Sequence, residues 1–259
     1  MKILQTAERV SEQHISDNYV YQRSLLAYFE AAKLISGNVL EIGTGSGYGI
    51  KLISPKTTKF LTIDKFESLN ITRLQETYKN VEFKKINVPP LSEIPGNAFD
   101  YIITFQVIEH IKEDKSFVAE AHRVLKSGGF LIISTPNKKM SLTRNPWHVR
   151  EYTTSELEKL LLSKFNSVEK YGVFGNEKVM DYYKKNKKSV EKITRFDLLN
   201  LQYRLPRWVL QIPYDILNRI NRKMLLRSNT SLASGITMDD YYLAKATEEC
   251  LDLFYIAQK

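Results

Sequence analysis

Short apolar runs alternate with helix-compatible segments over much of this chain. The runs are rich in β-branched and aromatic residues and lie at residues 39–42, 60–63, 81–86, 101–105 and 130–134. A strand followed by a helix, repeated several times, is the pattern of a parallel sheet whose faces are covered by helices. The sequence therefore predicts an α/β fold built on such a sheet.

Two helices are predicted with recognisable ends. Apolar residues at helical spacing predict a helix over residues 18–36, with Asp17 able to cap its start and Gly37 able to adopt a left-handed conformation after its end. A second helix is predicted over 112–126, with the glycine pair 128–129 ending it before the next strand.

The alternation stops after a predicted strand at 167–174. Residues 176 to about 249 indicate several helices or loops, with Pro206 and Pro213 as breakers. A last strand is predicted at 251–257. The expected organisation is a single domain over 1–259, divided as an N-terminal helical segment (1–37), a core (38–175), a basic helical insertion (176–249) and the final strand (250–259).

Composition limits the class of protein and its compartment. With 259 residues, 43% hydrophobic and 26% charged, the chain has the makeup of a globular protein with one large core. Its apolar runs fall far short of the roughly 20 residues of a spanning helix, and the first residues show no export signal. The single cysteine, Cys250, forms no intramolecular disulfide, so a reducing cytoplasm is expected.

A glycine-dense turn follows the first predicted strand. Glu41 lies near the end of that strand, and Gly43, Gly45 and Gly47 follow with Thr44 between the first two. Glycines here allow positive φ and let a ligand approach the backbone without a Cβ in the way. A dinucleotide fingerprint that starts at Gly43 requires glycine at position 48, where this chain has tyrosine, so a nicotinamide cofactor is disfavoured. A carboxylate at Glu41 also suits a cationic amino group better than a pyrophosphate.

This turn, with acidic and amide residues ending the next two strands, resembles the class I S-adenosylmethionine-dependent methyltransferases. The resemblance covers roughly Leu34 to Phe174 and the final strand. It implies a Rossmann-like, seven-stranded, mostly parallel sheet with helices on both faces. It also implies an antiparallel last strand and a helical insertion between strands six and seven.

The resemblance implies S-adenosylmethionine as the cofactor and assigns residues to it. The turn would pass under the methionyl part and ribose, Glu41 would reach the amino end, and Asp64 would accept the ribose hydroxyls. Asn87 stands where the family usually has aspartate beside the adenine, and Val88 would follow with its backbone N–H. The residues expected to bind the cofactor are Glu41, Gly43, Thr44, Gly45, Gly47, Asp64, Asn87, Val88 and Gln106.

Candidate catalytic groups follow the fourth predicted strand and the next one. Glu109 and His110 form a dipeptide similar to one in ubiquinone-pathway O-methyltransferases, and His148 lies in a later segment of residues 145–152. Both segments are expected at the carboxyl ends of strands, beside the cofactor crevice. His110 or His148 is placed to act as a base for a hydroxyl acceptor.

A metal ion is not expected at this site, although one alternative stays open. Glu109, His110 and His148 are similar to the divalent-metal ligands of small-RNA 2′-O-methyltransferases. Gln106 stands where that group has its first glutamate, so the site lacks one anionic ligand.

Most of the excess positive charge lies in one segment. The chain has a net charge of +9, and residues 171–230 alone carry 13 basic and 5 acidic side chains. Aromatic residues are interleaved with these charges, which fits an anionic substrate, an anionic membrane surface or nucleic acid. A solvated helical cap would also explain it.

The predicted activity is methyl transfer to a hydroxyl of a small molecule or glycan. The strand end at 134–137 and the segment after it resemble methyltransferases of surface-polysaccharide pathways. Nucleic acid is not expected as a partner, and peripheral contact with an anionic membrane is allowed. The alternatives are a nucleic-acid methyltransferase that uses the basic insertion, and a module that binds the cofactor without turnover.

Overall fold

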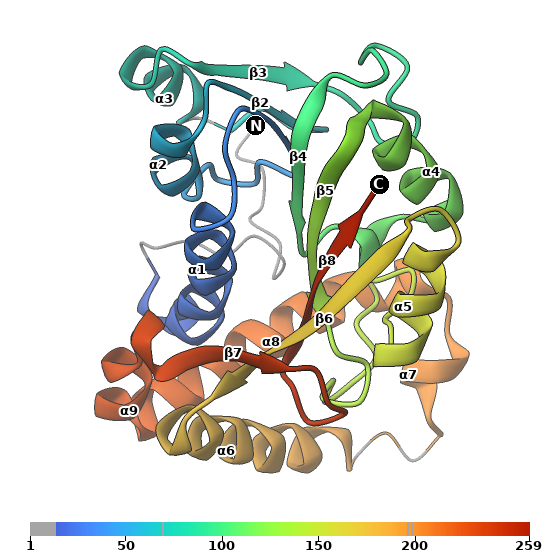
Figure 1. Cartoon of the computed structure of the whole chain (residues 1–259). Coiled ribbons are helices and arrows are strands. Elements are labelled where there is room, and N and C mark those ends of the chain that lie inside the picture. The colour runs from blue at the N-terminus through green and yellow to red at the C-terminus, as the bar shows by residue number, and fades with distance from the viewer. Residues whose placement is uncertain (1–13, 69, 196, 198) are drawn as a thin grey trace.

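The computed structural model describes residues 14–68, 70–195, 197 and 199–259, and its centre is a sheet of eight strands (Figure 1). The strand order is β3-β2-β1-β4-β5-β8-β6-β7. The strands are β1 (Asn38–Ile42), β2 (Lys59–Asp64), β3 (Val81–Lys85), β4 (Phe99–Phe105), β5 (Leu125–Pro136), β6 (Ser167–Gly175), β7 (Tyr241–Lys245) and β8 (Asp252–Gln258). Strands β1 to β5 run parallel, β8 is antiparallel to β5 and β6, and β7 is antiparallel to β6. The predicted Rossmann-like class and the antiparallel last strand are confirmed.

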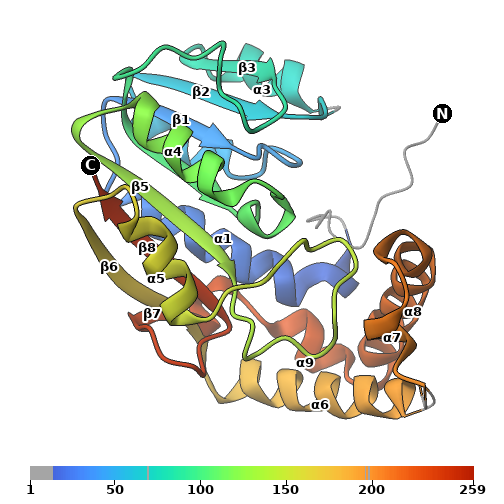
Figure 2. The same ribbon diagram turned by 90° about the vertical axis from the view of Figure 1, so that its right-hand side faces the viewer.

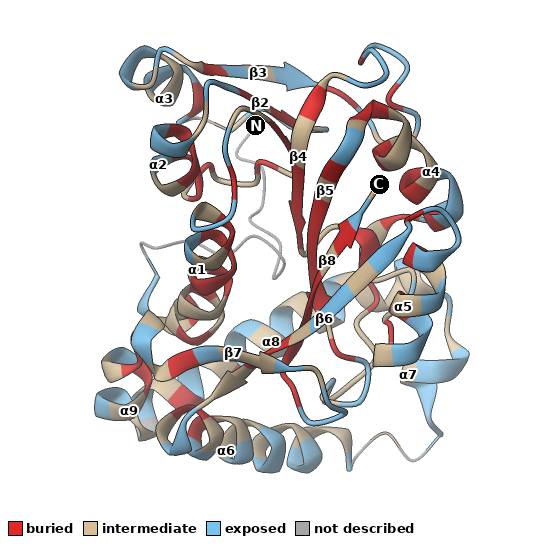
Figure 3. Ribbon diagram, viewed as in Figure 1, coloured by how far each residue is buried: buried red, intermediate tan, exposed pale blue. Residues whose placement is uncertain are grey.

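Alternation along the strands gives the sheet two buried faces. Leu131 and Ile133 of β5 belong to one hydrophobic cluster and Ile132 to the other, and all three are fully buried. Successive side chains of a strand point to opposite faces, so these runs bury both sides of the sheet. Figure 3 shows the buried residues gathered along the middle strands.

Helices cover both faces. The first cluster includes residues of α4 (Asp114–Val124) and α5 (Thr154–Leu162), and the second includes residues of α1 (Asn18–Ala32), α2 (Ile50–Ile53) and α3 (Ile71–Thr77). Short 3₁₀ turns complete this part of the chain: η1 (Ile15–Asp17), η2 (Ser54–Lys56) and η3 (Ile108–His110). Figure 1 shows α1, α2 and α3 on one side of the sheet and α4 and α5 on the other.

The insertion between β6 and β7 is helical. It contains α6 (Glu177–Thr194), α7 (Leu201–Arg204), α8 (Arg207–Ser228) and α9 (Thr230–Gly235), and η4 (Met238–Asp240) follows. Both ribbon views place these helices at one end of the sheet (Figures 1 and 2). Among the residues that the structure describes, no helix combines the length and the apolar character needed to cross a bilayer.

The sheet has one strand more than predicted. Residues 241–245 fall in the segment predicted to be helix or loop, but they form β7 at the sheet edge. Their pairing with residues 171–175 of β6 is distant in sequence, and Tyr241 is buried whereas Tyr242 is half exposed. A short edge strand of this kind depends on its partner more than on its own residues.

Two expectations about chain breakers were wrong. Gly128 and Gly129 do not end a helix, because β5 already begins at Leu125 and carries the pair through a register shift opposite β4. Pro213 does not break the chain but lies inside α8, where its exposed position tolerates the lost hydrogen bond.

Helix α1 begins at Asn18 as predicted, but its end and its cap differ from prediction. The helix ends at Ala32 rather than at residue 36, although Gly37 does adopt a positive φ of 68°. Asp17 makes no capping hydrogen bond with its side chain, which instead pairs with Arg222 of α8 at 2.7 Å. A tertiary ion pair thus replaces the predicted local cap.

Candidate functional site

The glycine turn after β1 adopts the conformations that its residues predict. Gly43, Gly45 and Gly47 have φ values of 98°, 57° and 80°. The N–H of Gly43 donates to the carbonyl of Ile63 at 2.8 Å, which holds the turn against the end of β2. A Cβ on Gly43 would lie 2.3 Å from a methyl group of Val107, whereas one on Gly45 would meet nothing within 4 Å. The turn is therefore closed on the Val107 side and open at Gly45.

Asp64 ends β2 beside this turn. One of its carboxylate oxygens accepts the Gly45 N–H at 2.9 Å, and the other accepts the Phe66 N–H at the same distance. Each oxygen has a second lone pair, so the half-buried carboxylate retains acceptor capacity. The structure thus brings Asp64 and the glycine turn together.

Glu41 is buried in β1 beneath the turn. Its Oε1 accepts the phenol of Tyr28 at 2.6 Å, and its Oε2 accepts the hydroxyl of Thr62 at 2.5 Å. The Thr62 hydroxyl also lies 2.6 Å from that of Thr44. Burial raises the pKa of Glu41 to about 7, against the opposing effect of the Thr62 and Tyr28 hydrogen bonds. Both Glu41 oxygens are thus engaged with hydroxyls of the protein itself.

The remaining predicted cofactor residues follow β3 and β4. Asn87 is exposed and Val88 half-buried just after β3, whose end is tied to β2 by the Ile86 N–H on the Asp64 carbonyl. Gln106 follows β4 with a φ of 58°, which is unusual for a residue other than glycine. Strands β1 to β4 therefore end at one edge of the sheet and bring these residues to it.

Glu109 and His110 form the end of η3, directly after β4. Glu109 is buried, and its Oε2 accepts the hydroxyl of Thr135 at 2.9 Å. Burial raises the pKa of the Glu109 carboxyl, although His110 and His148 oppose this shift. The His110 Nδ1 lies 3.1 Å from the carbonyl of Trp147, an atom that can only accept. We therefore assign the proton of neutral His110 to Nδ1, which leaves the lone pair on Nε2.

His148 lies beside this pair, on the loop between β5 and α5. Its Nδ1 is 2.7 Å from a Glu151 oxygen, and its Nε2 is 2.9 Å from the Asn145 amide nitrogen. The Asn145 oxygen accepts the Trp147 N–H at 3.0 Å, which fixes the amide orientation. His148 is thus assigned as neutral, with Nδ1–H donating to Glu151 and Nε2 accepting from Asn145.

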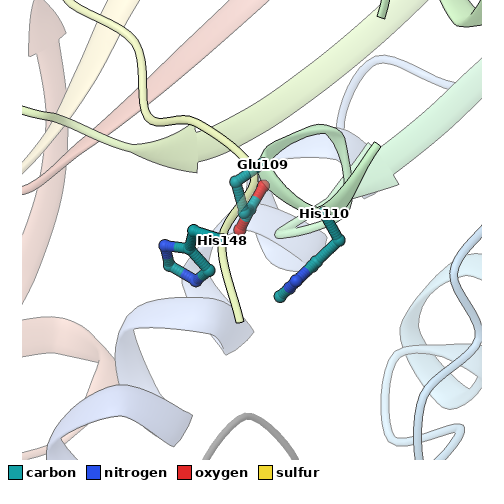
Figure 4. Close-up of side chains that lie close together, drawn as sticks. All are labelled: Glu109, His110 and His148. Carbon is teal, nitrogen blue, oxygen red and sulfur yellow. The ribbon is translucent and has the colours of Figure 1, made fainter. Parts of the chain in front are cut away.

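The three predicted catalytic side chains lie together (Figure 4). The rings of His110 and His148 are 5.0 Å apart between centroids and nearly perpendicular. The Val149 N–H donates to the Glu109 carbonyl at 2.6 Å, which attaches the His148 loop to η3. The arrangement places the His110 imidazole, whose Nε2 carries the lone pair in the assigned tautomer, next to a buried carboxyl.

Comparison with known proteins gives the family. The profile of a methyltransferase domain matches residues 13–166. The chain belongs to the S-adenosylmethionine-dependent methyltransferases. It is 32% identical to a probable S-adenosylmethionine-dependent methyltransferase of Mycolicibacterium smegmatis. The match extends over 176 residues, which are 65% of this chain and 68% of that protein. A ubiquinone biosynthesis O-methyltransferase of Hahella chejuensis is 29% identical over 112 residues, 42% of this chain and 47% of its own length.

Solved structures share the methyltransferase fold. A Thermotoga maritima protein described as an S-adenosylmethionine-dependent methyltransferase and possible histamine N-methyltransferase superposes with a TM-score of 0.55. It is 16% identical, and the match covers 93% of this chain and 92% of that one. The cyclase SpnF matches with a TM-score of 0.54 and 17% identity over 92% of this chain and 80% of its own. The fold therefore does not by itself decide the chemistry of the acceptor.

The cofactor of this methyltransferase is S-adenosylmethionine, and the residues on the sheet edge fit it. Gly45 leaves open space where any other residue would carry a Cβ, and the Asp64 carboxylate accepts the N–H of this same residue. The Asp64 carboxylate suits a ligand that carries an ammonium and a sulfonium, whereas both Glu41 oxygens already accept hydroxyls of the protein. The roles of the individual residues remain predictions.

Sequence reasoning missed the residues that support the site. Tyr28 lies in α1, and its ring occupies the place that a Cβ on Gly49 would take, at 2.1 Å. No local pattern pairs it with Glu41, 13 residues away on another element. Asn145 and Glu151 flank His148 at a spacing of three on each side, and polar residues at that spacing are the signal that was available.

The pH dependence of stability tests the state of Glu41. Its folded-state pKa is raised from 4.5 to about 7, so the folded protein favours the protonated form. Glu41 then stabilises the fold most below pH 4.5, and this contribution is lost as the pH rises from 4.5 to 7, by up to about 3 kcal/mol. In cofactor-free protein, we expect Glu41→Gln to remove this part of the slope in urea unfolding between pH 4.5 and 8. Equal slopes in the variant and the parent would contradict the assignment.

Metal binding tests the alternative that the sequence left open. Glu109, His110 and His148 each offer a ligand atom, and these atoms lie within 4.8 Å of one another. A metal on the His148 Nε2 would displace the Asn145 amide. We therefore expect no stoichiometric Mg²⁺ or Zn²⁺ by titration calorimetry or by metal analysis of protein purified without chelator. One bound equivalent that disappears in His148→Ala would contradict this prediction.

Proposed function

We propose that this methyltransferase transfers the methyl group to a hydroxyl of a small molecule or glycan, with His110 as the general base. S-adenosylmethionine supplies an already activated methyl group, so the protein has to align the acceptor and remove one proton. The acceptor oxygen forms the new bond to the methyl carbon while the carbon–sulfur bond breaks and its electron pair stays on sulfur. His110 Nε2 takes the hydroxyl proton.

The observation that carries this proposal is the hydrogen bond between His110 Nδ1 and the Trp147 carbonyl. It orients the ring and places the lone pair on Nε2, as a base requires. Glu109 lies next to it in the chain, buried and within the same cluster of side chains, and its carboxylate stabilises an imidazolium once the proton has moved. His148, held by Asn145 and Glu151, positions the cluster rather than receiving the proton.

The ubiquinone biosynthesis O-methyltransferases are named for methyl transfer to oxygen, which supports a hydroxyl acceptor. The match spans less than half of the Hahella chejuensis protein, so the main support for a hydroxyl acceptor is the site itself. We propose the cytoplasm as the compartment, since the one cysteine, Cys250, is buried and unpaired with another cysteine.

Methyl-labelled S-adenosylmethionine and fractionated cell extract provide the test. We expect the protein to transfer the label to a small molecule or glycan. This label should therefore remain when RNA and DNA are removed from the extract. The labelled product should resist nucleases and carry a methyl ether by mass spectrometry. A parallel incubation with His110→Ala is the control, and it should leave the same fraction unlabelled.

A nucleic-acid acceptor is the second candidate, favoured by the basic insertion. Part of that charge is already paired: Lys178 with Asp240, Lys185 with Asp181 and Arg222 with Asp17. Nuclease-sensitive labelling, together with binding that weakens steeply with salt, would establish this candidate. Cofactor binding without labelling of any fraction would favour a non-catalytic module.

A further inference from the structure

Helix α8 presents apolar side chains to solvent along its length. Trp208, Ile212, Ile216, Ile220 and Met224 follow one another at every fourth position, and Leu217 lies beside them. All six are between 47% and 75% exposed. Residues four apart lie on one side of a helix, so they form a continuous stripe. We call these six residues the α8 stripe.

The opposite side of α8 makes the contacts with the protein. Asn221 and Leu225 are buried, and Arg222 pairs with Asp17 of η1. Asp215 accepts the indole N–H of Trp147 at 3.0 Å. A surface helix ordinarily turns its apolar side inward, and α8 instead exposes large aliphatic side chains in a row. Such exposed apolar patches mark interaction sites.

Basic residues border the α8 stripe. Arg219, Lys223 and Arg227 are exposed and also follow one another at every fourth position. At 100° per residue they fall among the stripe residues, on its half of the helix. The one acidic residue of α8, Asp215, accepts the indole N–H of Trp147 and lies one turn before Arg219. The outer side of the helix therefore combines aliphatic and cationic groups.

We propose that the α8 stripe docks on an anionic membrane surface. A helix that lies in the interface buries an apolar side at the boundary of headgroups and acyl chains, and its basic residues meet anionic lipid phosphates. Trp208 at the start of the stripe suits this boundary, because its ring is apolar and its indole N–H polar. Arg219, Lys223 and Arg227 supply the complementary charge.

Two other occupants fit these residues less well. A second copy of the chain would have to cover three basic side chains, and the single carboxylate of α8, Asp215, is half-buried and already accepts the Trp147 indole N–H. Single-stranded nucleic acid stacks its bases on aromatic rings, and four of the six stripe residues are isoleucine or leucine. A lipid surface satisfies both the aliphatic and the cationic groups.

Docking would place the acceptor side of the site near the lipid. Trp147 contacts α8 through Asp215, and Arg207 at the start of α8 donates to the Val149 carbonyl at 2.7 Å. These two contacts flank His148 on its loop. If the proposed function holds, an acceptor carried on a lipid would reach His110 from the membrane side. This consequence rests on the proposed function, whereas the docking does not.

Vesicle co-sedimentation of the full chain tests the docking. We expect binding to vesicles of phosphatidylcholine with phosphatidylglycerol, and at least about tenfold weaker binding to phosphatidylcholine alone or at high salt. Replacing Ile212, Ile216 and Ile220 together by serine should weaken binding at least about tenfold, since each isoleucine contributes buried apolar area. Leu162→Ser, on α5 and similarly exposed, is the matched control and should bind as the parent does.

Two further measurements keep the result unambiguous. Cofactor affinity of the triple variant should equal that of the parent, which shows that it folds. Vesicles should shift the Trp208 fluorescence to the blue, and Trp208→Phe should lose that shift. The proposal is overturned if the parent does not bind anionic vesicles, if the triple variant binds them equally well, or if that variant only converts a dimer into a monomer in sedimentation. Vesicle binding is measured without any methyl acceptor. A failure of the docking proposal and a failure of the proposed methyl transfer can therefore be told apart.

Discussion

Replacement of Asp64 by alanine is expected to weaken S-adenosylmethionine binding by about 100-fold. A carboxylate that accepts both ribose hydroxyls makes two hydrogen bonds with a charged partner, each worth about 1.5–3 kcal/mol, and tenfold in affinity corresponds to about 1.4 kcal/mol. The half-buried position of Asp64 at the open side of the glycine turn leaves these lone pairs available to a ligand. Titration calorimetry with the cofactor measures the loss.

Two variants separate ribose binding from support of the turn. Asp64 also accepts the N–H groups of Gly45 and Phe66, so alanine removes local support as well. Asp64→Asn keeps an acceptor for one of these groups but loses the charge, and we expect about tenfold weaker binding. Glu76→Ala, an exposed carboxylate on α3, changes the net charge equally and should bind as the parent does. Unchanged affinity in Asp64→Ala would remove this residue from the cofactor site.

The glycine turn and its place beside Asp64 could be predicted from the sequence because their determinants are local. The turn needs glycines at positions of positive φ, and Gly43, Gly45 and Gly47 stand at those positions. Asp64 ends the neighbouring strand, and parallel strands bring their carboxyl ends to one edge. A residue that ends a predicted strand therefore has a predictable place, even when its partners are unknown.

The partners of these residues could not be predicted, since tertiary packing chooses them. Tyr28 reaches Glu41 from α1, and Asp17 pairs with Arg222 more than 200 residues later rather than capping its own helix. The edge strand β7 forms because its backbone pairs with that of β6. Sequence patterns report what a segment prefers, whereas these contacts depend on which segments meet.

The acceptor side of the site could be predicted only in part. Sequence placed Glu109, His110 and His148 at the carboxyl ends of strands, and the structure brings them within one cluster. It did not distinguish the two histidines, because that difference lies in the Trp147 carbonyl and in the side chains of Asn145 and Glu151. The hydrogen bonds support the different roles proposed for the two histidines.

The two histidines should therefore differ in their variants. We expect His110→Ala to lower the methyl-transfer rate constant by about 10²- to 10⁴-fold, the usual contribution of a general base. His148→Ala should lower it by about tenfold, because it disturbs the loop through Asn145 and Glu151 but removes no proton acceptor. Cofactor affinity should stay within about twofold in both, since neither ring takes part in holding the glycine turn. Single-turnover transfer to the labelled acceptor fraction measures the rates.

Chemical rescue distinguishes a base from a structural residue. Added imidazole should restore part of the rate of His110→Ala, because a free base can occupy the space and take the acceptor proton. It should not restore His148→Ala, whose loss is one of position. His122→Ala is the matched control, since His122 packs against Phe165 on the α4 side of the sheet and should leave the rate unchanged. Equal rates for His110→Ala and the parent, or rescue of both site variants alike, would assign the proton to another group.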